Sequence, residues 1–522
     1  MTLAADPRTL PLFDPVRSIL EAFAAAPDRV VLRDEDGPVS AAAASALIHR
    51  TIRMLESAGI GPGDAVPCIV DGCAVTLLTR ISIDALGATY FELPDSVAAA
   101  DMARYVERAG ATVVLVDETG GDAAERSAAL RPLLPAVRFI PMSALGDGSA
   151  RDEDAVPAAG AASDALGALV PAELRREARE FRLTSGTSGP PKMAMLHSAL
   201  RVRPRTAATV LPVDEATRFM VCGRPPRYVA DILGHGGTVR TFRDFDAGAV
   251  LRAIADEGIT LLLACPDYLR ALVEHPDRRQ VDTSSLRCLM GAGAPASAQL
   301  LGEVVSAFGP ILRFGYGQTE AGGITALAPG DYWPDSLERL GTCGRPIRGV
   351  EIAIGEPDSP LPPGSRGPIW VHTRSAMIGY VDPPGLTEQV LRDGWVRTGD
   401  AGVLDADGYL TVLGRMEDAI DLGGRTVSPR EIEECLELHP GVYRAAALTM
   451  PDADSVRSAL HVAVVRRDTQ ADAAALREWL AEHFGVDGVP HRLRFIDRIP
   501  LNHGYSTDYP ALRRWFEAGN PR

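Results

Sequence analysis

Residues 184–192 read Thr-Ser-Gly-Thr-Ser-Gly-Pro-Pro-Lys, a run that combines four hydroxyl side chains, two glycines and one lysine. The glycines permit a tight turn whose backbone N–H groups can converge on an anion. The lysine adds a compact positive charge suited to phosphate, and the proline pair before it is foreign to the GxxxxGK(S/T) loop of P-loop NTPases. The run predicts a phosphate-binding loop made by Thr184, Ser185, Gly186, Thr187, Ser188, Gly189 and Lys192.

Lys192 is the only lysine among the 522 residues, so 52 of the 53 basic side chains are arginines. Lysine is normally one of the commonest residues in proteins. Its single occurrence at the end of this run favours phosphate binding over an ordinary polar surface loop. Any chemistry that needs a lysine must use Lys192.

Charge and composition exclude several classes of protein. Asp and Glu outnumber Lys and Arg by 69 to 53, and the resulting net charge of −16 argues against a nucleic-acid partner. No apolar run approaches the roughly 20 residues that a membrane-spanning helix needs. The seven cysteines form no CxxC pair, which favours a reduced, cytoplasmic protein without a zinc site.

Hydrophobic periodicity predicts an α/β architecture. Buried strands are expected where short apolar runs occur, at 65–70, 111–116, 259–265 and 286–290. Amphipathic stretches at 247–256 and 297–308 are typical of helices, and their alternation with the strands predicts parallel sheets covered by helices. From 364 to 413, short strands between Gly, Asp and Pro turns predict a small β subdomain.

A separate unit is expected after residue 414. Residues 428–431 read Ser-Pro-Arg-Glu, which has the pattern of a capping box with proline at the first helical position and predicts a helix over 429–438. Two strands and a second helix are expected at 445–450, 460–466 and 474–483. These elements together predict a small α+β domain.

Four segments, in order along the chain, resemble the signature motifs of the adenylate-forming superfamily, which contains acyl-CoA synthetases, peptide-synthetase adenylation domains and luciferases. Residues 184–192 match T-S-G-T-T-G-x-P-K closely, and Met193 replaces the glycine that usually follows. Residues 315–320 (GYGQTE) resemble Y-G-x-T-E, and residues 397–400 (RTGD) match the family's R-T-G-D. Residues 414–433 contain GRMED and GRTVSPREIE, which resemble the hinge and the start of the C-terminal domain.

The resemblance implies the overall fold and the reaction. The fold would be α/β: a large N-terminal domain (1–414) with two helix-flanked sheets and a small β-barrel subdomain, then a small mobile α+β domain (415–522). In the reaction a carboxylate attacks the α-phosphate of ATP to give an acyl-adenylate and pyrophosphate, and a nucleophile then displaces AMP. ATP and Mg²⁺ are the implied cofactors, and CoA is one possible acceptor.

The resemblance also implies roles for individual residues at the phosphate end of the site. Thr184 to Gly189 and Lys192 would hold the β- and γ-phosphates. Thr319 would hydrogen-bond the α-phosphate. Glu320 would bind Mg²⁺, a hard cation that prefers carboxylate and phosphate oxygens.

At the nucleoside end, Tyr316 would offer a flat face to adenine, beside the small turn Gly293-Ala294-Pro295. Asp400 would accept the ribose hydroxyls, and Arg415 would lie near ribose and phosphate. Glu417 matches the hinge position, about which the small domain rotates between the half-reactions.

The sequence departs from the family in two places. Most members have a lysine near the C-terminus that bridges the carboxylate and the α-phosphate; here Ser506 falls at that position, and His503 and Arg415 are the alternative cations. In the acyl pocket, Arg227 falls near the usual histidine or aromatic position, which indicates an anionic group on the substrate unless the arginine faces solvent. Gly317 is expected at the same substrate site.

These observations favour an ATP-dependent ligase of a small, aromatic carboxylic acid. Transfer to a thiol (CoA or a carrier protein) or to an amine is expected, and the departures from the family suit biosynthesis of a specialised metabolite such as an antibiotic. Two alternatives stay open. One is a diazotase-type member that activates nitrite for coupling to an aryl amine. The other is an inactive nucleotide-binding homologue, because the C-terminal lysine is missing.

Overall fold

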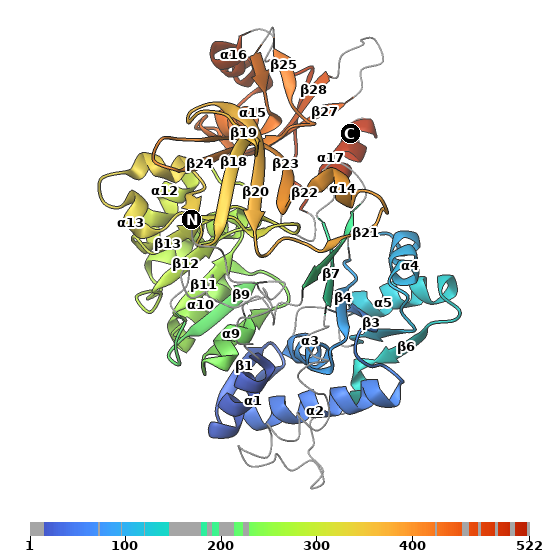
Figure 1. The fold of residues 1–522 in the computed structure, drawn as a ribbon. Coiled ribbons are helices and arrows are strands. Elements are labelled where there is room, and N and C mark those ends of the chain that lie inside the picture. Colours follow the sequence, from blue (N-terminus) through green and yellow to red (C-terminus); the bar gives the residue numbers. More distant parts are fainter. Residues whose placement is uncertain are drawn as a thin grey trace.

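The computed structural model describes most of the chain (Figure 1). The described residues are 15–70, 74–95, 97–118, 121–145, 179–184, 191–197, 213–222, 229–422, 425–450, 459–467, 471–485, 489–501 and 507–518. No helix in this part of the chain combines the length and the apolarity that crossing a membrane requires.

One seven-stranded sheet carries the predicted phosphate loop. Its order is β21-β8-β7-β4-β3-β5-β6, parallel from β7 to β6 and antiparallel across β7, β8 and β21. The strands are β3 (Ala65–Ile69), β4 (Thr89–Glu92), β5 (Val113–Val116), β6 (Arg138–Pro141), β7 (Arg179–Leu183), β8 (Met193–His197) and β21 (Gly379–Asp382). The helices beside it are α2 (Ala41–Ser57), α3 (Ala74–Leu86), α4 (Ala99–Arg108) and α5 (Gly121–Leu130).

A second seven-stranded sheet has the order β13-β12-β11-β9-β10-β1-β2 and is parallel except for β2. Its strands are β1 (Val30–Asp34), β2 (Gly37–Ser40), β9 (Arg218–Cys222), β10 (Thr238–Phe242), β11 (Leu261–Ala264), β12 (Cys288–Gly291) and β13 (Leu312–Phe314). The helices are α1 (Pro15–Ala25), α9 (Val229–Gly234), α10 (Ala247–Glu257), α11 (Pro266–Glu274) and α12 (Ala298–Phe308). These bounds confirm the strands and helices predicted from the apolar runs.

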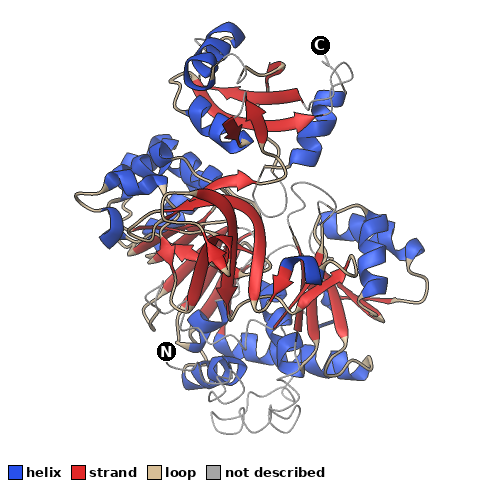
Figure 2. Cartoon of the chain, turned by 45° about the horizontal axis from the view of Figure 1, so that its top comes forward, coloured by secondary structure: helices blue, strands red, loops and turns tan. Residues whose placement is uncertain are grey.

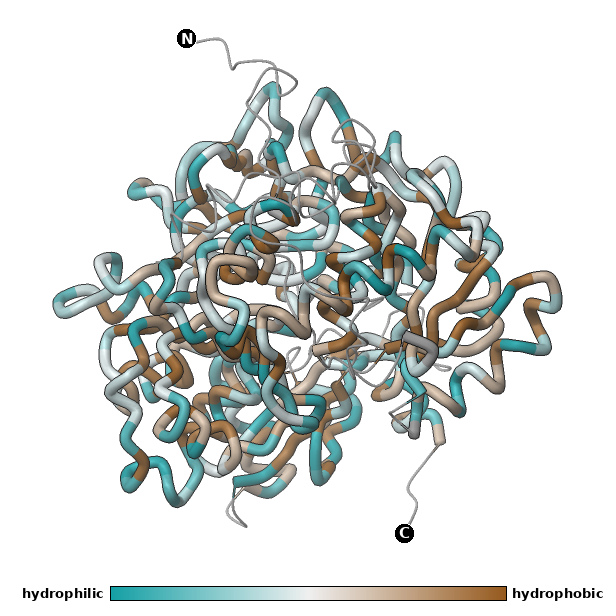
Figure 3. Tube along the Cα trace, turned by 90° about the horizontal axis from the view of Figure 1, so that it is seen from below, coloured by the Kyte–Doolittle hydropathy of each residue, from teal (hydrophilic) through white to brown (hydrophobic). Residues whose placement is uncertain are grey.

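A common hydrophobic core joins the two sheets. Ile48 of α2 and Leu78 of α3 are buried in the same cluster as Val66 of β3 and Phe219 of β9. Hydrophobic and hydrophilic residues alternate along the chain trace (Figure 3), as expected for helices that bury one face and expose the other. Helix α3 contacts β4 of the first sheet and β1 of the second, and α2 packs on α3, so these helices join the two sheets.

An antiparallel β subdomain follows the second sheet, as predicted (Figure 2). Its strand order is β19-β18-β20-β23-β22, and β24 also pairs with the long strand β23. The strands are β18 (Val350–Glu356), β19 (Ser359–Pro360), β20 (Arg366–Thr373), β22 (Leu391–Arg392), β23 (Trp395–Leu404) and β24 (Leu410–Arg415). Short elements surround it: β14 (Gly317–Gln318), β15 (Gly322–Gly323), β16 (Thr325–Ala326), α13 (Pro329–Tyr332), β17 (Arg345–Pro346) and α14 (Thr387–Val390).

The C-terminal domain packs helices against a three-stranded sheet of order β27-β28-β29. Its elements are β25 (Ile420–Leu422), β26 (Arg425–Val427), α15 (Pro429–Glu437), β27 (Val442–Met450), β28 (Ala459–Arg466), α16 (Ala473–Phe484), β29 (Arg492–Phe495) and α17 (Tyr509–Glu517). The predicted capping box is confirmed, since Ser428 Oγ accepts from the Glu431 N–H and Glu431 accepts from the Ser428 N–H. The division after residue 414 and the mobility of this domain stay predictions.

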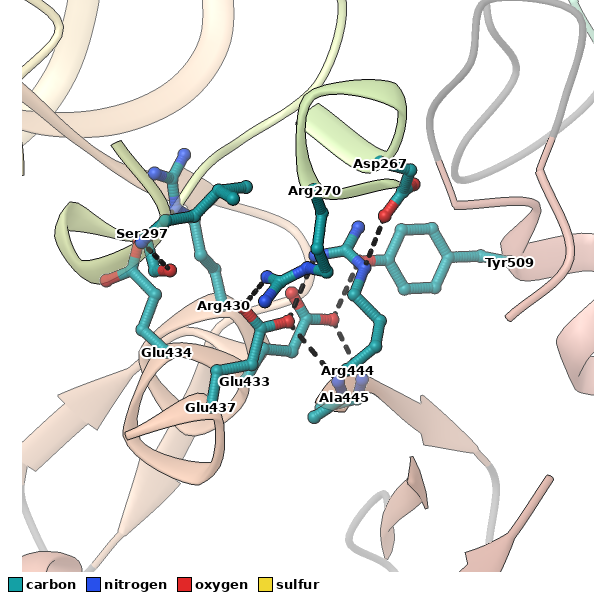
Figure 4. A network of polar contacts seen from close by, with 12 residues as sticks. Asp267, Arg270, Ser297, Arg430, Glu433, Glu434, Glu437, Arg444, Ala445 and Tyr509 are labelled. Carbon is teal, nitrogen blue, oxygen red and sulfur yellow. Dashed lines mark hydrogen bonds and ion pairs between the residues drawn. The ribbon is translucent and has the colours of Figure 1, made fainter. Parts of the chain in front are cut away.

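A buried ion-pair network joins the two domains (Figure 4). Arg270 of α11 lies 3.4 Å from Glu437 of α15, measured from Nη2 to Oε2. Arg444 of β27 contacts both domains: its Nη1 is 3.0 Å from Glu437 Oε1 and its Nε is 3.2 Å from Asp267 Oδ1. The side chains of Arg270 and Glu437 are only 6% and 5% exposed, so each charge depends on its partner.

Replacing Arg444 with methionine is expected to destabilise the protein strongly. The substitution keeps the apolar stem but leaves the buried carboxylate of Glu437 short of a cation, a change that costs about 3–5 kcal/mol. Urea denaturation followed by circular dichroism measures the effect. The control is Arg17→Met, which breaks an exposed pair with Glu21 worth about 0.5 kcal/mol. Equal losses in the two variants would contradict the expectation.

Glu433 is expected to make stability depend on pH. Its Oε1 accepts hydrogen bonds from the Ala447 N–H (2.8 Å) and the Tyr509 hydroxyl (2.9 Å), and burial raises its pKa to about 7. Between its usual pKa and pH 7 the folded state therefore holds a proton that the unfolded state has lost, so stability falls as pH rises through this window.

The isosteric Glu433→Gln variant removes this titration and keeps both hydrogen bonds. Relative to it, the unmodified protein should lose about 3 kcal/mol of unfolding free energy between pH 4.5 and 8. Parallel urea titrations at several pH values give the difference. A constant difference would show that Glu433 ionises alike in both states.

Candidate functional site

The predicted phosphate loop connects two antiparallel strands, β7 and β8. Leu183 pairs with Met193, and just beyond this pair the Thr184 N–H donates to the Lys192 carbonyl oxygen over 2.9 Å. The Lys192 N–H donates back to Thr184 Oγ1 over 3.0 Å. Both ends of the loop are therefore held together. Its central residues, Ser185, Gly186, Thr187, Ser188 and Gly189, lie outside the described residues.

The segment that resembles Y-G-x-T-E begins at the carboxyl end of β13. Gly291 of β12 pairs with Phe314 of β13, so the turn Gly293-Ala294-Pro295 and Tyr316 leave the sheet from the same edge. Ligands of open α/β sheets bind at this edge. At Gly315 a Cβ atom would lie 2.5 Å from the carbonyl oxygen of Thr325, so only glycine permits this close approach of backbones.

Asp400 is the centre of the first cluster of predicted site residues. Its Oδ2 accepts hydrogen bonds from the Tyr316 hydroxyl (2.5 Å) and from Gln318 Nε2 (2.6 Å). Its Oδ1 lies 3.3 Å from Arg415 Nε. Asp400 pairs with Arg415 across β23 and β24, so this pair follows directly from strand register.

Burial controls the protonation of this cluster. Desolvation raises the pKa of Asp400, although Arg415, Tyr316 and Gln318 oppose the shift. Desolvation, reinforced by the Asp400 carboxylate, raises the pKa of Tyr316 well above its usual value. Tyr316 therefore remains a hydrogen-bond donor to Asp400 at neutral pH.

A second cluster surrounds Glu320. Its Oε1 accepts a hydrogen bond from the Tyr380 hydroxyl over 2.6 Å, and the Met377 N–H donates to its carbonyl oxygen over 2.8 Å. Lys192 Nζ lies 5.9 Å from the centroid of the Tyr380 ring. Burial, with the Glu320 carboxylate beside it, raises the pKa of Tyr380, so its hydroxyl stays protonated.

The two clusters meet on one short segment. Tyr316 and Gln318 lie on the Asp400 side, and Glu320 lies on the Lys192 side. Gly317 is in β14, and Thr319 follows that strand directly. Glu417 is two residues beyond Arg415, whose pKa it helps to raise. Arg227, His503 and Ser506 lie outside the described residues.

Sequence reasoning missed three residues of these clusters. Gln318 and Thr398 lie inside the quoted motifs, but nothing in the motifs indicates that Gln318 Nε2 donates to both Asp400 and the Thr398 carbonyl oxygen. Tyr380 follows Ile378-Gly379 with no spacing signal at all. Only the pairing of distant strands reveals it.

The side chains near Glu320 suit a Mg²⁺ ion that is bound partly by protein and partly by nucleotide phosphates. Within the described residues no group of three or more His, Cys, Asp or Glu side chains could hold a metal alone. Mg²⁺ is usually bound by one or two carboxylates together with substrate phosphates. Glu320 supplies such a carboxylate, and Lys192, on the other side of Tyr380, is the predicted phosphate-binding cation.

Two segments of the chain match known protein families. Residues 20–381 match the family of AMP-binding enzymes, and residues 431–504 match the AMP-binding enzyme C-terminal domain. The chain belongs to the AMP-binding enzyme family. Its adenylate-forming resemblance and its fold class are thereby confirmed.

Relatives of this AMP-binding enzyme are ligases. It is 30% identical to a feruloyl-CoA synthase from Amycolatopsis sp over 503 residues, 94% of this chain and 96% of that protein. It is 33% identical to a sulfoacetate–CoA ligase from Cupriavidus necator over 67% of this chain and 70% of that protein. The structure of the amide bond synthetase McbA from Marinactinospora thermotolerans has a TM-score of 0.78 and 28% identity, and the match covers 96% of this chain and all of that one. The chain is therefore an AMP-forming ligase.

Asp400→Asn in this AMP-binding enzyme is expected to weaken ATP binding. The amide loses the ion pair with Arg415, and its NH₂ group cannot accept the hydrogen bonds that one carboxylate oxygen now accepts. The predicted ribose acceptor is therefore both neutral and displaced. Loss of hydrogen bonds to a charged group costs about 1.5–3 kcal/mol, which corresponds to roughly 10- to 150-fold in affinity. Isothermal titration with ATP measures it.

Asp405→Asn provides the matched control, because Asp405 follows the same strand but is bound to Arg339 and Tyr409. Its ATP affinity should equal that of the unmodified protein. An Asp400→Asn variant with unchanged affinity would remove Asp400 from the ribose site.

Proposed function

We propose that this chain activates a small aromatic carboxylic acid as an acyl-adenylate and then transfers the acyl group to a thiol or an amine. ATP and Mg²⁺ are the proposed cofactors, CoA or a carrier protein the proposed thiols, and the cytoplasm the proposed location. The observation that carries the proposal is the pair of clusters on residues 316–320. Tyr316 contacts Asp400, which pairs with Arg415, and Glu320 contacts Tyr380, whose ring lies beside Lys192. The relatives named as a feruloyl-CoA synthase and an amide bond synthetase support the aromatic acid and the two acceptors.

In the first step a carboxylate oxygen attacks the α-phosphorus of ATP, and the bond to the bridging oxygen of pyrophosphate breaks. Lys192 and the phosphate loop would bind the β- and γ-phosphates, and the Thr319 hydroxyl would donate to the α-phosphate. Glu320 would hold Mg²⁺, which would supply positive charge against the negative charge of the leaving group. This charge stabilisation, together with alignment of the carboxylate, lowers the barrier.

The C-terminal lysine that bridges the carboxylate and the α-phosphate in most family members is missing here, so another cation is needed for this role. Because Lys192 is the only lysine, an arginine or histidine has to offset charge where the carboxylate approaches the α-phosphate. We assign this role to Arg415, which the ion pair with Asp400 (3.3 Å) and a hydrogen bond to the Thr398 carbonyl oxygen (3.0 Å) hold in place.

Pyrophosphate release from ATP tests the proposal directly. A panel of aryl and short alkyl acids, with nitrite as one member, is incubated with ATP and Mg²⁺; CoA, amines and aryl amines are then added in turn. Release with an aryl acid is expected, and the acceptor that stimulates turnover defines the second step. Release only with nitrite and an aryl amine would indicate a diazotase instead. ATP binding without release from any acid would indicate a nucleotide-binding protein without this activity.

Glu320→Gln is expected to slow pyrophosphate release about 100-fold, because a metal contributes several kcal/mol of charge stabilisation. Glu338→Gln, at an exposed position, is the matched control and should retain full activity. Equal rates in both variants would show that Glu320 holds no catalytic metal.

A further inference from the structure

Tyr380 lies between the two charged groups of the phosphate end of the site. It belongs to β21, the edge strand that pairs antiparallel with β8, and its pairing partner is Ala194. Alternate residues of an extended chain point to the same face of a sheet. Tyr380 is therefore placed beside Lys192, two residues before Ala194.

Its contacts join residues that are distant in sequence. The hydroxyl donates to Glu320 Oε1 over 2.6 Å, and the centroid of the ring lies 5.9 Å from Lys192 Nζ. Among the described residues, Oε1 is the only carboxylate oxygen of Glu320 with a hydrogen-bond donor. A hydrogen bond to a carboxylate is strong and directional, and a cation within about 6 Å of an aromatic ring centroid is attracted to it.

The backbone around Tyr380 is fixed by further contacts. Its N–H donates to Thr387 Oγ1 over 2.9 Å. At Gly379 a Cβ atom would lie 2.9 Å from the same Oγ1, so the strand approaches α14 more closely than a side chain allows. The Met377 N–H holds the Glu320 backbone from the same segment. The tyrosine and the carboxylate therefore have little freedom to move relative to each other.

We propose that Tyr380 is a positioning residue of the nucleotide site, whose hydroxyl orients Glu320 for the metal while its ring holds Lys192 for the phosphates. The inference rests on the proposed function, because it assigns Mg²⁺ to Glu320. One oxygen of the carboxylate is committed to Tyr380, and the other is left for the cation. Partners of metal ligands that act in this way typically change metal affinity or activity 10- to 100-fold when they are removed.

Tyr380→Phe tests the hydroxyl without removing the ring. With protein in excess over ATP, electron paramagnetic resonance of Mn²⁺ gives the metal concentration that half-saturates the protein–ATP complex. We expect this concentration to rise about 10-fold or more in Tyr380→Phe. The affinity for ATP in EDTA, measured by isothermal titration, should stay unchanged because Lys192 and the ring remain.

Tyr380→Leu tests the ring separately. This variant should show the same loss of Mn²⁺ affinity and should also bind metal-free ATP about two- to fivefold more weakly, since a contact between a ring and an exposed cation is worth about 0.5–1 kcal/mol. Tyr409→Phe is the matched control: it too removes a hydroxyl that donates to a carboxylate, Asp331 Oδ1 at 2.9 Å, but in the β subdomain. It should leave both affinities unchanged.

Glu320→Gln separates this inference from the proposed function. If Glu320→Gln weakens Mn²⁺ binding and Tyr380→Phe does not, the positioning role is wrong while the metal ligand stands. If Glu320→Gln has no effect on Mn²⁺ binding, the metal assignment is wrong, and the role of Tyr380 falls with it. The proposal would also be overturned if Tyr380→Phe lost as much affinity for metal-free ATP as for Mn²⁺. Equal losses would indicate general damage to the site.

Discussion

The site of this enzyme is organised around one buried carboxylate, which needs hydrogen-bond donors or cations as partners. Asp400 is only 6% exposed, and an aspartate taken out of water needs donors or cations around it. Its partners come from two directions: Tyr316 and Gln318 follow the second α/β sheet, and Arg415 lies on the neighbouring strand of the β subdomain. The subdomain is therefore locked to the sheet edge at the one place where a nucleotide is expected, and Tyr316 is kept in a single orientation.

Local patterns predicted much of this structure. The apolar runs identified β3, β5, β11 and β12, and the Ser-Pro-Arg-Glu pattern identified the start of α15. Both signals are local, because a strand's burial pattern and a helix cap depend on neighbours in sequence. The motifs also identified Tyr316, Glu320, Asp400 and Arg415, which the structure brings into two adjoining clusters. What each of these residues does in the reaction is still a prediction.

Other features could not be predicted, because they arise between segments far apart in sequence. Strand order places β21 beside β8, and no local pattern in either strand specifies that neighbour. The contact of Tyr380 with Glu320 requires both this strand pairing and the turn after β14. The hydrogen bond from Gln318 to Asp400 likewise joins two motifs that are far apart in sequence.

The edge position of β21 also bears on how the molecule is made. Strand β8 emerges from the ribosome with the phosphate loop, but Tyr380, which pairs with Ala194, is synthesised only much later. At 5–20 residues per second this interval lasts on the order of 10 to 40 s. During that time the side of β8 that later pairs with β21 is exposed, and other extended chains can pair with such an edge. A chaperone that shields nascent strands should therefore matter most for this enzyme while residues 198–378 are being translated.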